Sequence, residues 1–348
     1  MKAIVFSEQG GTEVLRYTDV PEPTLHANEV LVKVEGCAVN YLDLHARRNR
    51  PEIAAKLSRG DTPHILGSDI AGTIAEVGDT RCGVTVGTRV VLAPCIPCGV
   101  CRDCRHGTEN LCDTQELIGF QTNGGYAGYV KAPAQNAIQI PDTLSFINAA
   151  AMPIAYLTAW HMLMTRAQLR LGEDVLILGV GGGVGSAGLQ IAKLTGARVF
   201  ATASSDEKLA RAREMGADVT INYKDVDFSE VVLDATDGRG VDVVLEHVGA
   251  ATWEQSIASL AKNGRLVSCG VTTGNIGTIN IRKMYQKQLT IMGSALGTVT
   301  ELRTLIQLAA RGKLEPIIDR TLPLHRASEA HSVLENRQNF GKVVLVNA

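Results

Sequence analysis

The stretch Asp174-Val-Leu-Ile-Leu-Gly-Val-Gly-Gly-Gly-Val-Gly-Ser-Ala-Gly-Leu-Gln-Ile-Ala-Lys193 decides the fold. Residues 175–178 form an unbroken apolar run, which is typical of a strand covered on both faces of a parallel sheet. The glycines of 179–185 then let the backbone turn sharply and approach a ligand closely. A helix expected from about Ser186 would direct its free N–H groups and its positive dipole end at that turn, which favours a pyrophosphate. We therefore predict a dinucleotide site.

The glycine pattern is compatible with two registers of the dinucleotide-binding motif. Gly179, Gly182 and Gly185 keep a three-residue spacing, whereas a literal G-x-G-x-x-G at 183–188 starts late after the strand, so we prefer the first register. The alternative is a glycine-rich turn without a ligand, because the fingerprint counts only between a strand and a helix. The predicted contacts of the turn are Gly179, Gly182, Gly183, Val184 and Gly185.

Length and composition indicate an ordinary globular chain. Its 348 residues are enough for about two domains. Hydrophobic residues make up 45% and the net charge is −2, so no basic excess points to nucleic acid or to an anionic membrane surface. Residues 1–10 lack the apolar core of a signal peptide, and no apolar run reaches spanning length. We expect a cytoplasmic protein.

The predicted secondary structure changes in type near residue 150. Residues 1 to about 150 are rich in strands and turns, and 29–35 alternates at the period of a strand. Strands then alternate with helices, which predicts right-handed βαβ units in an open parallel sheet. The expected strands are 174–178, 198–202, 219–221, 241–246 and 264–269, and the expected helices are 148–166, 186–195, 206–215 and 251–262. The strand-like segment 341–346 is expected to return to the first domain.

Five of the eight cysteines fall between Cys95 and Cys112, while Cys37, Cys82 and Cys269 stand alone. Without an export signal, such clustering favours a metal site over disulfides. Four thiolates with this spacing can converge on one tetrahedral centre and leave no open position, so we expect one structural zinc per chain. Cys95 also leaves an iron–sulfur cluster or an empty reduced lobe open. The predicted zinc ligands are Cys98, Cys101, Cys104 and Cys112.

The cysteine lobe, the glycine turn after a β-rich region and the segment Gly67-Ser-Asp-Ile-Ala-Gly72 together resemble the medium-chain dehydrogenase/reductase superfamily. The resemblance covers essentially the whole chain. It implies an α/β protein with a GroES-like catalytic domain at 1–152, which carries the zinc lobe at 95–112, and a doubly wound Rossmann domain at 153–292. The segment 293–348 would complete the catalytic domain, and nicotinamide would meet substrate in a cleft. The resemblance also implies homodimers or homotetramers. Separately, the strand-like segment 288–293 suggests an edge that could extend the Rossmann sheet across a two-fold axis. Cys95 has no counterpart in the family.

The departures from the family concern the catalytic metal. Asn40 stands where zinc alcohol dehydrogenases carry a cysteine ligand, and their Gly-His-Glu motif reads Gly67-Ser68-Asp69 here. Ile154 stands at the third ligand position. One anionic oxygen and weak donors make a poor cage for zinc, and Cys37 would supply a ligand only in a shifted alignment. Residues 38–43 instead resemble the quinone and enone reductase branch, which usually lacks the zinc lobe.

The cofactor prediction depends on the end of the second Rossmann strand. Ala203 stands where an acidic residue would bind the ribose of NAD, so a 2′-phosphate is not repelled. Serine hydroxyls and Lys208 can bind that phosphate, and Tyr223 matches a phosphate-side tyrosine of the reductase branch, which favours NADP(H). The alternative is that Ser204 only caps the following helix. The predicted cofactor residues beyond the glycine turn are Ser204, Ser205, Lys208, Tyr223, Val248, Gly249, Gly270 and Val271, with a plain turn role open for Gly270 and Gly293.

The resemblance and the missing metal ligands together predict hydride transfer from NADPH to a quinone or an α,β-unsaturated carbonyl, with hydroxyl groups polarising the substrate. Asn40 would position the substrate or the nicotinamide ribose, and Tyr41 would donate a proton. Asp43 would order this network, and Ser68 and Thr158 would provide polar contacts. The alternatives are that Tyr41 belongs to the core and that Asp43 is a structural acceptor.

Two other functions stay open. A zinc-type alcohol dehydrogenase acting on alcohols or aldehydes would need a second metal, and a non-enzymatic NADPH-binding protein would need none. The segment with His45, Arg47, Arg48 and Arg50, which precedes the polar stretch 51–63, is expected to form a solvated charged face. The alternative is that its arginines bind acidic substrates or thioester phosphates. His161 and His247 are expected to be internal histidines.

Overall fold

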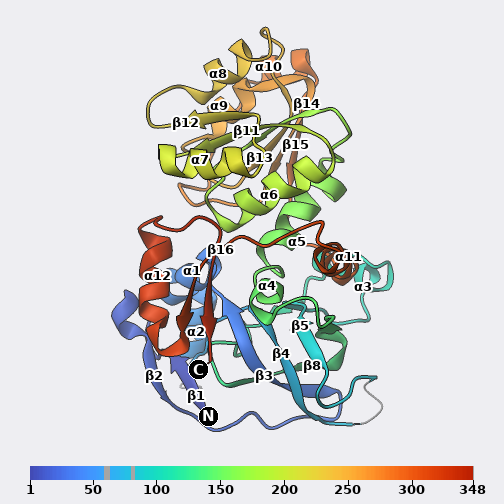
Figure 1. Ribbon diagram of the computed structural model, residues 1–348, viewed down its shortest axis with the longest axis vertical. Helices are drawn as coiled ribbons and strands as arrows, with labels where there is room; N and C mark the ends of the chain where they lie inside the picture. Colours follow the sequence, from blue (N-terminus) through green and yellow to red (C-terminus); the bar gives the residue numbers. More distant parts are fainter. Residues whose placement is uncertain (59–62, 80–82, 348) are drawn as a thin grey trace. The chain divides into compact units, whose positions relative to one another are not determined.

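The computed structural model describes residues 1–58, 63–79 and 83–347 (Figure 1). Cys82 and part of the polar stretch 51–63 lie outside the described residues. The chain divides into two compact units: a catalytic unit made of Met1–Ala155 with Thr298–Ala348, and a Rossmann unit made of Tyr156–Gly297. Among the described residues, no helix has the length and apolar character needed to cross a membrane.

The catalytic unit is built on a seven-stranded sheet with the order β16-β17-β3-β4-β5-β9, and β8 also pairs with β3. Its longest strand, β3, covers the predicted strand at 29–35 and continues to Ala38. The C-terminal strand β17 runs antiparallel to β3, with Leu345 opposite Cys37. On its other side β3 pairs with β4, with Ala38 opposite Asp69. Residues from three distant parts of the sequence therefore meet at one end of the sheet.

The strands of this unit are β1 (Lys2–Val5), β2 (Arg16–Asp19), β3 (Glu29–Ala38), β4 (Asp69–Val77), β5 (Arg89–Leu92), β6 (Cys95–Ile96), β7 (Glu116–Leu117), β8 (Tyr129–Pro133), β9 (Ala137–Gln139), β16 (Ile318–Pro323) and β17 (Lys342–Val346). The helices are α1 (Tyr41–Asn49), α2 (Pro51–Ser58), α3 (Arg102–Arg105), α4 (Phe146–Ala150), α11 (Val299–Ala310) and α12 (Ala327–Glu335), and short 3₁₀ turns occur at Thr12–Val14, Glu109–Leu111, Ala134–Asn136 and Leu324–Arg326.

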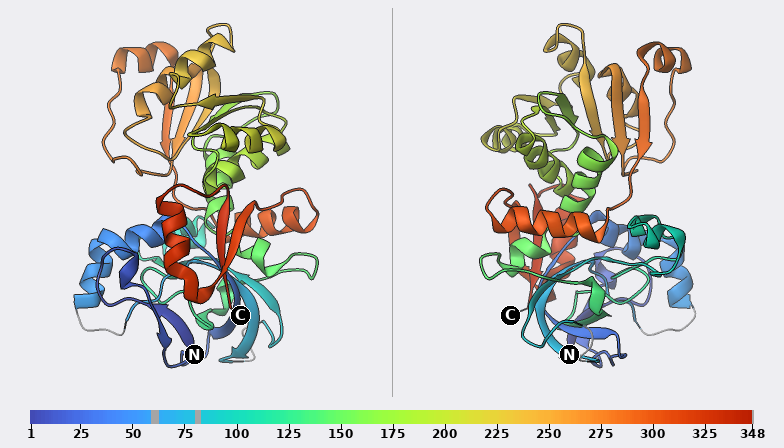
Figure 2. Two further views of the ribbon diagram at one scale, coloured as in Figure 1. Left: turned by 60° about the vertical axis from the view of Figure 1, so that its left-hand side comes forward. Right: turned by 90° about the vertical axis from the view of Figure 1, so that its right-hand side faces the viewer.

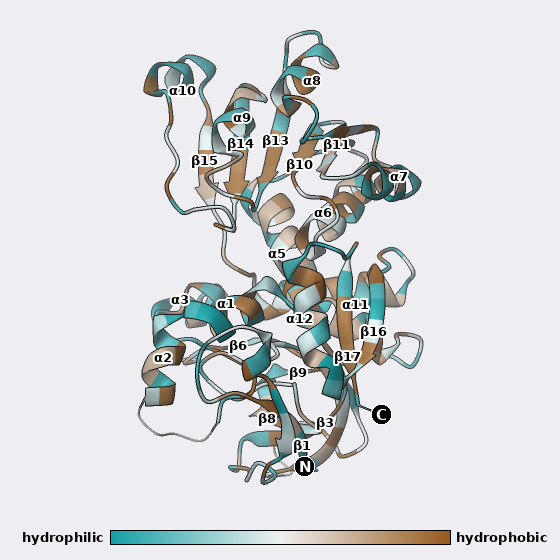
Figure 3. Cartoon of the chain, turned by 90° about the vertical axis from the view of Figure 1, so that its left-hand side faces the viewer, coloured by the Kyte–Doolittle hydropathy of each residue, from teal (hydrophilic) through white to brown (hydrophobic). Residues whose placement is uncertain are grey.

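The Rossmann unit is a six-stranded parallel sheet with the order β12-β11-β10-β13-β14-β15, which is the 3-2-1-4-5-6 order of dinucleotide-binding folds. The predicted strand at 174–178 is β10, in the middle of this order, and the apolar central strands appear brown in Figure 3. Helices flank the sheet on both sides (Figure 2). The strands are β10 (Asp174–Ile177), β11 (Arg198–Ala203), β12 (Val219–Asn222), β13 (Val241–Glu246), β14 (Leu260–Ser268) and β15 (Thr290–Gly293). The helices are α6 (Gly183–Leu194), α7 (Asp206–Glu214), α8 (Phe228–Asp234), α9 (Trp253–Ala258) and α10 (Ile281–Lys287).

Three local expectations need correction. The predicted helix at 148–166 is broken: α4 ends at Ala150, α5 (Ala155–Trp160) follows, and His161–Arg166 is a π-helix. Pro153 lies in the break, where its missing N–H group would interrupt a continuous helix. Helix α6 starts three residues before the expected Ser186, because the last glycines of the turn already form its first turn. Helix α9 ends at Ala258 and β14 starts at Leu260, so residues assigned to a helix up to 262 belong to a strand.

Candidate functional site

Asn40 begins helix α1 in the catalytic unit and is almost completely buried. It forms a capping box with Asp43: the Asn40 side chain accepts from the N–H group of Asp43, and the Asn40 N–H donates to Asp43 Oδ2 at 2.8 Å. Two orphan donors at the helix start are thereby satisfied. The pair is a rigid element at the end of β3.

The sequence analysis missed the partner of this pair, which is Lys342 at the start of β17. Its ammonium group donates to Asp69 Oδ2 at 2.9 Å, to the carbonyl of Val39 at 3.1 Å and to Asn40 Oδ1. Lys342 and Asp69 have side chains only 3% and 0% exposed. The Asn40 amide also donates to Asp69 Oδ2 at 2.9 Å, and Asp69 Oδ1 accepts from Ile154 N at 2.7 Å. We call Asn40, Asp43, Asp69 and Lys342 the Asn40 cluster.

The Asn40 cluster does not fit a catalytic zinc ion. An ammonium group has three hydrogens, and all three are used by oxygen atoms of Val39, Asn40 and Asp69. A metal ion bound to the same oxygens would therefore face a fixed positive charge. Burial raises the pKa of the Cys37 thiol well above its usual range, so this neighbouring cysteine is a neutral thiol and a poor metal ligand. The donor set lacks the thiolates and imidazoles that zinc prefers.

Asp43 is 1% exposed, and two backbone N–H groups orient its carboxylate. Asn40 N donates at 2.8 Å and Gly67 N at 3.2 Å, and burial together with the nearby Asp43 raises the pKa of Tyr126 well above its usual range. Burial nevertheless raises the pKa of Asp43 to about 7, and the nearby Asp69 acts in the same direction, while the N–H donors and Lys342 oppose the rise. Asp43 is therefore expected to change its protonation state near neutral pH.

The other predicted catalytic residues lie in different surroundings. The Tyr41 hydroxyl donates to the carbonyl of Leu334 at 2.8 Å, and its ring packs on the core of the catalytic unit. Ser68 is 1% exposed and adjoins Asp69 in the sequence. Thr158 is buried on α5 and belongs to the Rossmann unit. The roles of these three residues stay predictions.

The structure brings together the four cysteines that the spacing indicates. The Sγ atoms of Cys98, Cys101, Cys104 and Cys112 all lie within 4.8 Å of one another. Backbone N–H groups point at the sulfurs: Cys98 N lies 3.5 Å from Cys112 Sγ, and Cys101 N lies 3.3 Å from Cys98 Sγ. N–H donors from Val100 and Cys101 lower the pKa of the Cys98 thiol to about 6, which favours a thiolate. These donors fit a closed zinc site, and buried Cys95 is not a member of the group.

Steric contacts in the glycine turn of the Rossmann unit agree with the register that we prefer. Gly179 has a φ of +55°, and its carbonyl accepts from Gly182 N at 2.9 Å. A Cβ on Gly185 would lie 2.4 Å from the oxygen of Gly179. Gly182 caps α6 without a side-chain acceptor, so no capping side chain occupies the start of this helix, where a phosphate is predicted to bind.

The residues predicted to recognise the adenosine ribose follow β11 and β12. Ser205, and not Ser204, caps α7, because its side chain accepts from Lys208 N at 3.5 Å. The side chain of Lys208 lies over the glycine turn, where a Cβ on Gly181 would be 3.5 Å from Nζ. Tyr223 N donates to the carbonyl of Ala203 at 3.2 Å, which holds the ends of the two strands together. Ser204 and Lys208 are partly exposed and accessible to a phosphate.

The third group of predicted cofactor residues is held by Glu246, which the sequence analysis missed. This buried carboxylate ends β13 and accepts from Val248 N at 2.6 Å and from Gly249 N at 3.0 Å. The hydroxyls of Thr252 and Ser256 complete its set of donors. An acidic residue at the end of an apolar strand was the available signal. In the neighbouring loop, Gly270 packs so closely on the backbone of His247 that a Cβ would lie 2.4 Å from its oxygen, and Val271 is exposed.

The structure tests two predictions about side chains: an internal position for His247 and a solvated face for the arginines of α1. His247 is an internal histidine, as expected, with Nε2 2.6 Å from the carbonyl of Leu178. A solvated face is wrong for Arg47, which is 0% exposed and pairs with Glu335. It fits Arg48, whose side chain is 50% exposed.

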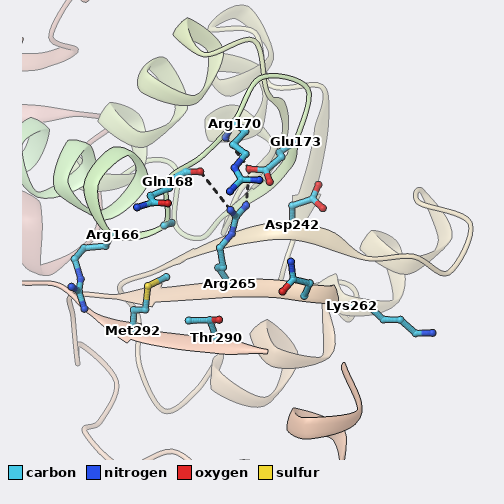
Figure 4. Close-up of a pocket in the computed structure, with 11 residues that line it drawn as sticks. Arg166, Gln168, Arg170, Glu173, Asp242, Lys262, Arg265, Thr290 and Met292 are labelled. Carbon is cyan, nitrogen blue, oxygen red and sulfur yellow. Dashed lines mark hydrogen bonds and ion pairs between the residues drawn. The ribbon is translucent and has the colours of Figure 1, made fainter. Parts of the chain in front are cut away.

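A cavity of about 330 Å³ lies in the Rossmann unit, lined by Arg166, Arg170, Lys262 and Arg265 among others (Figure 4). It adjoins the amino ends of β10, β13 and β15, opposite to the edge with the glycine turn. Arg265 is neutralised there by Glu173 at 2.6 Å. The cavity is therefore separate from the predicted cofactor residues.

Comparisons with known proteins agree with both units. The family model for the alcohol dehydrogenase GroES-like domain matches residues 26–142, and that for the zinc-binding dehydrogenase matches residues 183–311. An alcohol dehydrogenase of Geobacillus stearothermophilus is 34% identical over 347 residues, which cover 99% of this chain and 98% of that protein. The crystal structure of an NAD-dependent alcohol dehydrogenase is 39% identical, with a TM-score of 0.93 and full coverage of both chains. The structure of crotonyl-CoA carboxylase/reductase AntE in complex with NADP is 27% identical, with a TM-score of 0.93 over 99% of this chain and 94% of that one. The chain therefore belongs to the zinc-type medium-chain dehydrogenase/reductase superfamily and is an NAD(P)-dependent oxidoreductase.

Proposed function

We propose that the protein is an NADPH-dependent reductase of quinones or α,β-unsaturated carbonyl compounds that works without catalytic zinc. The observation that carries this proposal is the Asn40 cluster. At the position of the family's metal ligands, Lys342 binds Asn40 and Asp69, and its charge takes the place that a metal ion would need. Reduction of an activated alkene or quinone does not require a Lewis acid, whereas oxidation of an alcohol by this family normally uses one.

Bound NADPH would supply the hydride, and the protein would position the acceptor and donate hydrogen bonds to its carbonyl oxygen. The Asn40 amide is committed to Asp69 and Lys342, so its part is to fix the shape of the polar end of the site. The hydroxyls of Ser68 and Thr158 remain the candidates for contact with substrate. Asp43 orders this end of the site through the capping box.

The preference for NADPH is part of the proposal. It is supported by Ala203 in place of an acidic residue and by the partly exposed Ser204 and Lys208 beside the glycine turn. One similar protein binds NADP in its structure, whereas another is named NAD-dependent. Fluorescence titration with NADPH and NADH decides the point, and equal affinity for both would contradict the proposal.

The substrate test is a panel of quinones, enones, enoyl thioesters and aldehydes, with NADPH oxidation as the readout. Enoyl thioesters are included because a crotonyl-CoA carboxylase/reductase is among the similar proteins. We expect turnover of activated alkenes or quinones and none of simple aldehydes. Metal analysis on the same sample should give one zinc per chain, held by the four cysteines.

Two results favour the other functions. Two zinc ions per chain with aldehyde turnover would indicate an alcohol dehydrogenase, which the names of several relatives suggest. NADPH binding without oxidation of any compound would indicate a binding protein. A cytoplasmic location and a homodimer or homotetramer belong to the same proposal, and light scattering measures the second.

A further inference from the structure

Behind the Asn40 cluster lies a second line of buried polar side chains, contributed by α1, α12 and the loop that precedes β8. Arg47 and His331 are 0% exposed, and Tyr126 is equally buried. Arg47 Nη1 lies 3.3 Å from His331 Nδ1, and His331 Nε2 lies 3.1 Å from the Tyr126 hydroxyl. The next group along this line is Asp43: burial, and after it the nearby Asp43, raise the pKa of the Tyr126 hydroxyl well above its usual range. None of these three residues has a place in the proposed reaction so far.

The chemistry of the groups fixes the direction of every bond in this line. A guanidinium group can only donate, so His331 Nδ1 must be the acceptor. A neutral imidazole then carries its one proton on Nε2 and donates it to the Tyr126 oxygen. The remaining hydrogen of the Tyr126 hydroxyl is free to be donated to Asp43. At the outer end, Arg47 is neutralised by the carboxylate of Glu335, which Arg48 also contacts at 2.8 Å.

We infer that Arg47, His331 and Tyr126 form a one-way hydrogen-bond chain that delivers a donor to Asp43 and so positions the Asn40–Asp43 capping box of the candidate active site. A hydrogen bond donated to a carboxylate stabilises its charged form more than its neutral form. The chain therefore favours the carboxylate. The three residues are positioning residues, because they act on the site through Asp43.

The charges around the chain are consistent with this direction. Burial, assisted by Arg47 and Arg48, lowers the pKa of His331 to about 3, so the imidazole stays neutral. Asp43 is also faced by Asp69, which disfavours its carboxylate, and by Lys342, which favours it. The Cys37 thiol nearby is neutral. The Tyr126 donor adds to the Lys342 charge and to the two backbone N–H donors.

The first experiment measures the His331 tautomer and does not depend on enzyme activity. The protein is labelled with ¹⁵N-histidine, and two-bond ¹H–¹⁵N spectra are recorded between about pH 5 and 9. We expect a neutral ring with the proton on Nε2 throughout, and loss of that signal in His331→Asn for assignment. A proton on Nδ1, or titration of the ring within this range, would overturn the inference.

A second arm removes the donor that sets the direction. In Arg47→Met the ring loses both the guanidinium donor and the neighbouring charge, so the pKa of His331 should rise by more than one unit, by about two or three at most. Arg47→Lys keeps the charge and serves as the folding control. An unchanged His331 pKa in folded Arg47→Met protein would contradict the chain.

The third arm rests on the proposed function and uses the pH profile of NADPH oxidation. Tyr126→Phe removes a donor from the Asp43 carboxylate, so the acid limb of kcat/KM should move up by about one pH unit. Tyr129→Phe, three residues away on β8 and outside the chain, should leave the profile unchanged. Identical profiles of the two variants would refute the role of Tyr126. If no compound is reduced, the proposed function fails. The His331 tautomer would still show whether the hydrogen-bond chain runs in the inferred direction.

Discussion

Replacing Lys342 with methionine tests the feature on which the proposed function depends. Methionine keeps much of the length of the side chain but removes the ammonium group, so Asp69 keeps only the donors Ile154 N and Asn40 Nδ2. Both charges of the wild-type pair are buried, at 3% and 0% exposure, so solvent does not screen their attraction. Nor can solvent stabilise the Asp69 charge once the ammonium group is removed. Removing one partner of such a pair costs about 3–5 kcal/mol of unfolding free energy.

The assay is urea denaturation, monitored by hydrogen exchange of the β3 and β17 amides. These amides report the unfolding of the catalytic unit. Both tryptophans, Trp160 and Trp253, lie in the Rossmann unit, so their fluorescence provides an internal control. Lys342→Arg retains a cation and should recover part of the loss. In the double variant with Asp69→Asn, the two losses should overlap by about 1–3 kcal/mol.

A loss below about 1 kcal/mol, within the usual range for an exposed pair, would refute the reasoning. Strictly additive losses in the double variant would do the same, because they would mean that Lys342 and Asp69 do not interact. A second zinc bound by the wild-type protein would also contradict the reading of the Asn40 cluster.

Three further predictions concern the zinc lobe, the cofactor and pH. Cys104→Ser should lose zinc in metal analysis, whereas Cys95→Ser should keep one zinc per chain; equal loss in both would place Cys95 among the ligands. Lys208→Ala should weaken NADPH binding about ten-fold or more, with NADH binding unchanged in the same fluorescence titration. Because the pKa of Asp43 is raised from its ordinary value to about 7, its contribution to stability is complete below the unfolded pKa and falls as pH rises through 7. Asp43→Asn should therefore flatten the pH dependence of the melting temperature between about pH 5 and 8, whatever its effect on absolute stability, and an unchanged slope would show that Asp43 does not titrate there.

Local patterns in the sequence predicted the parts of the structure whose causes are local. The strand at 241–246 was predicted at both ends, because an apolar run stands between turn residues and no distant partner is needed to recognise it. The glycine turn was predicted for the same reason: its strand, turn and helix are contiguous. The break at Pro153 was underestimated, since the flanking residues favour a helix on either side.

The missed residues are those whose role depends on distant partners. From the sequence, Lys342 beside a glycine would be expected on the surface. Only the pairing of β17 with β3 brings it to Asn40. Arg47 lies in a run of cations that is typical of a solvated face, yet Glu335 and His331 bury it. Charge patterns along the chain indicate exposure only where no opposite charge arrives from elsewhere in the fold.

The pairing of β17 with β3 also has a consequence for synthesis. Lys342 and Val39 are separated by 303 positions, so the Asn40 cluster lacks its cation until the ribosome has synthesised the long segment between them. The Rossmann unit is one continuous segment and can fold earlier, as domains generally do during translation. Nascent chains that stop before β17 would retain the buried acid Asp69 without its counter-charge. We therefore expect the unit that carries the Asn40 cluster to become stable after the Rossmann unit, and chains that lack β17 to be cleaved more readily at the sheet that β17 completes.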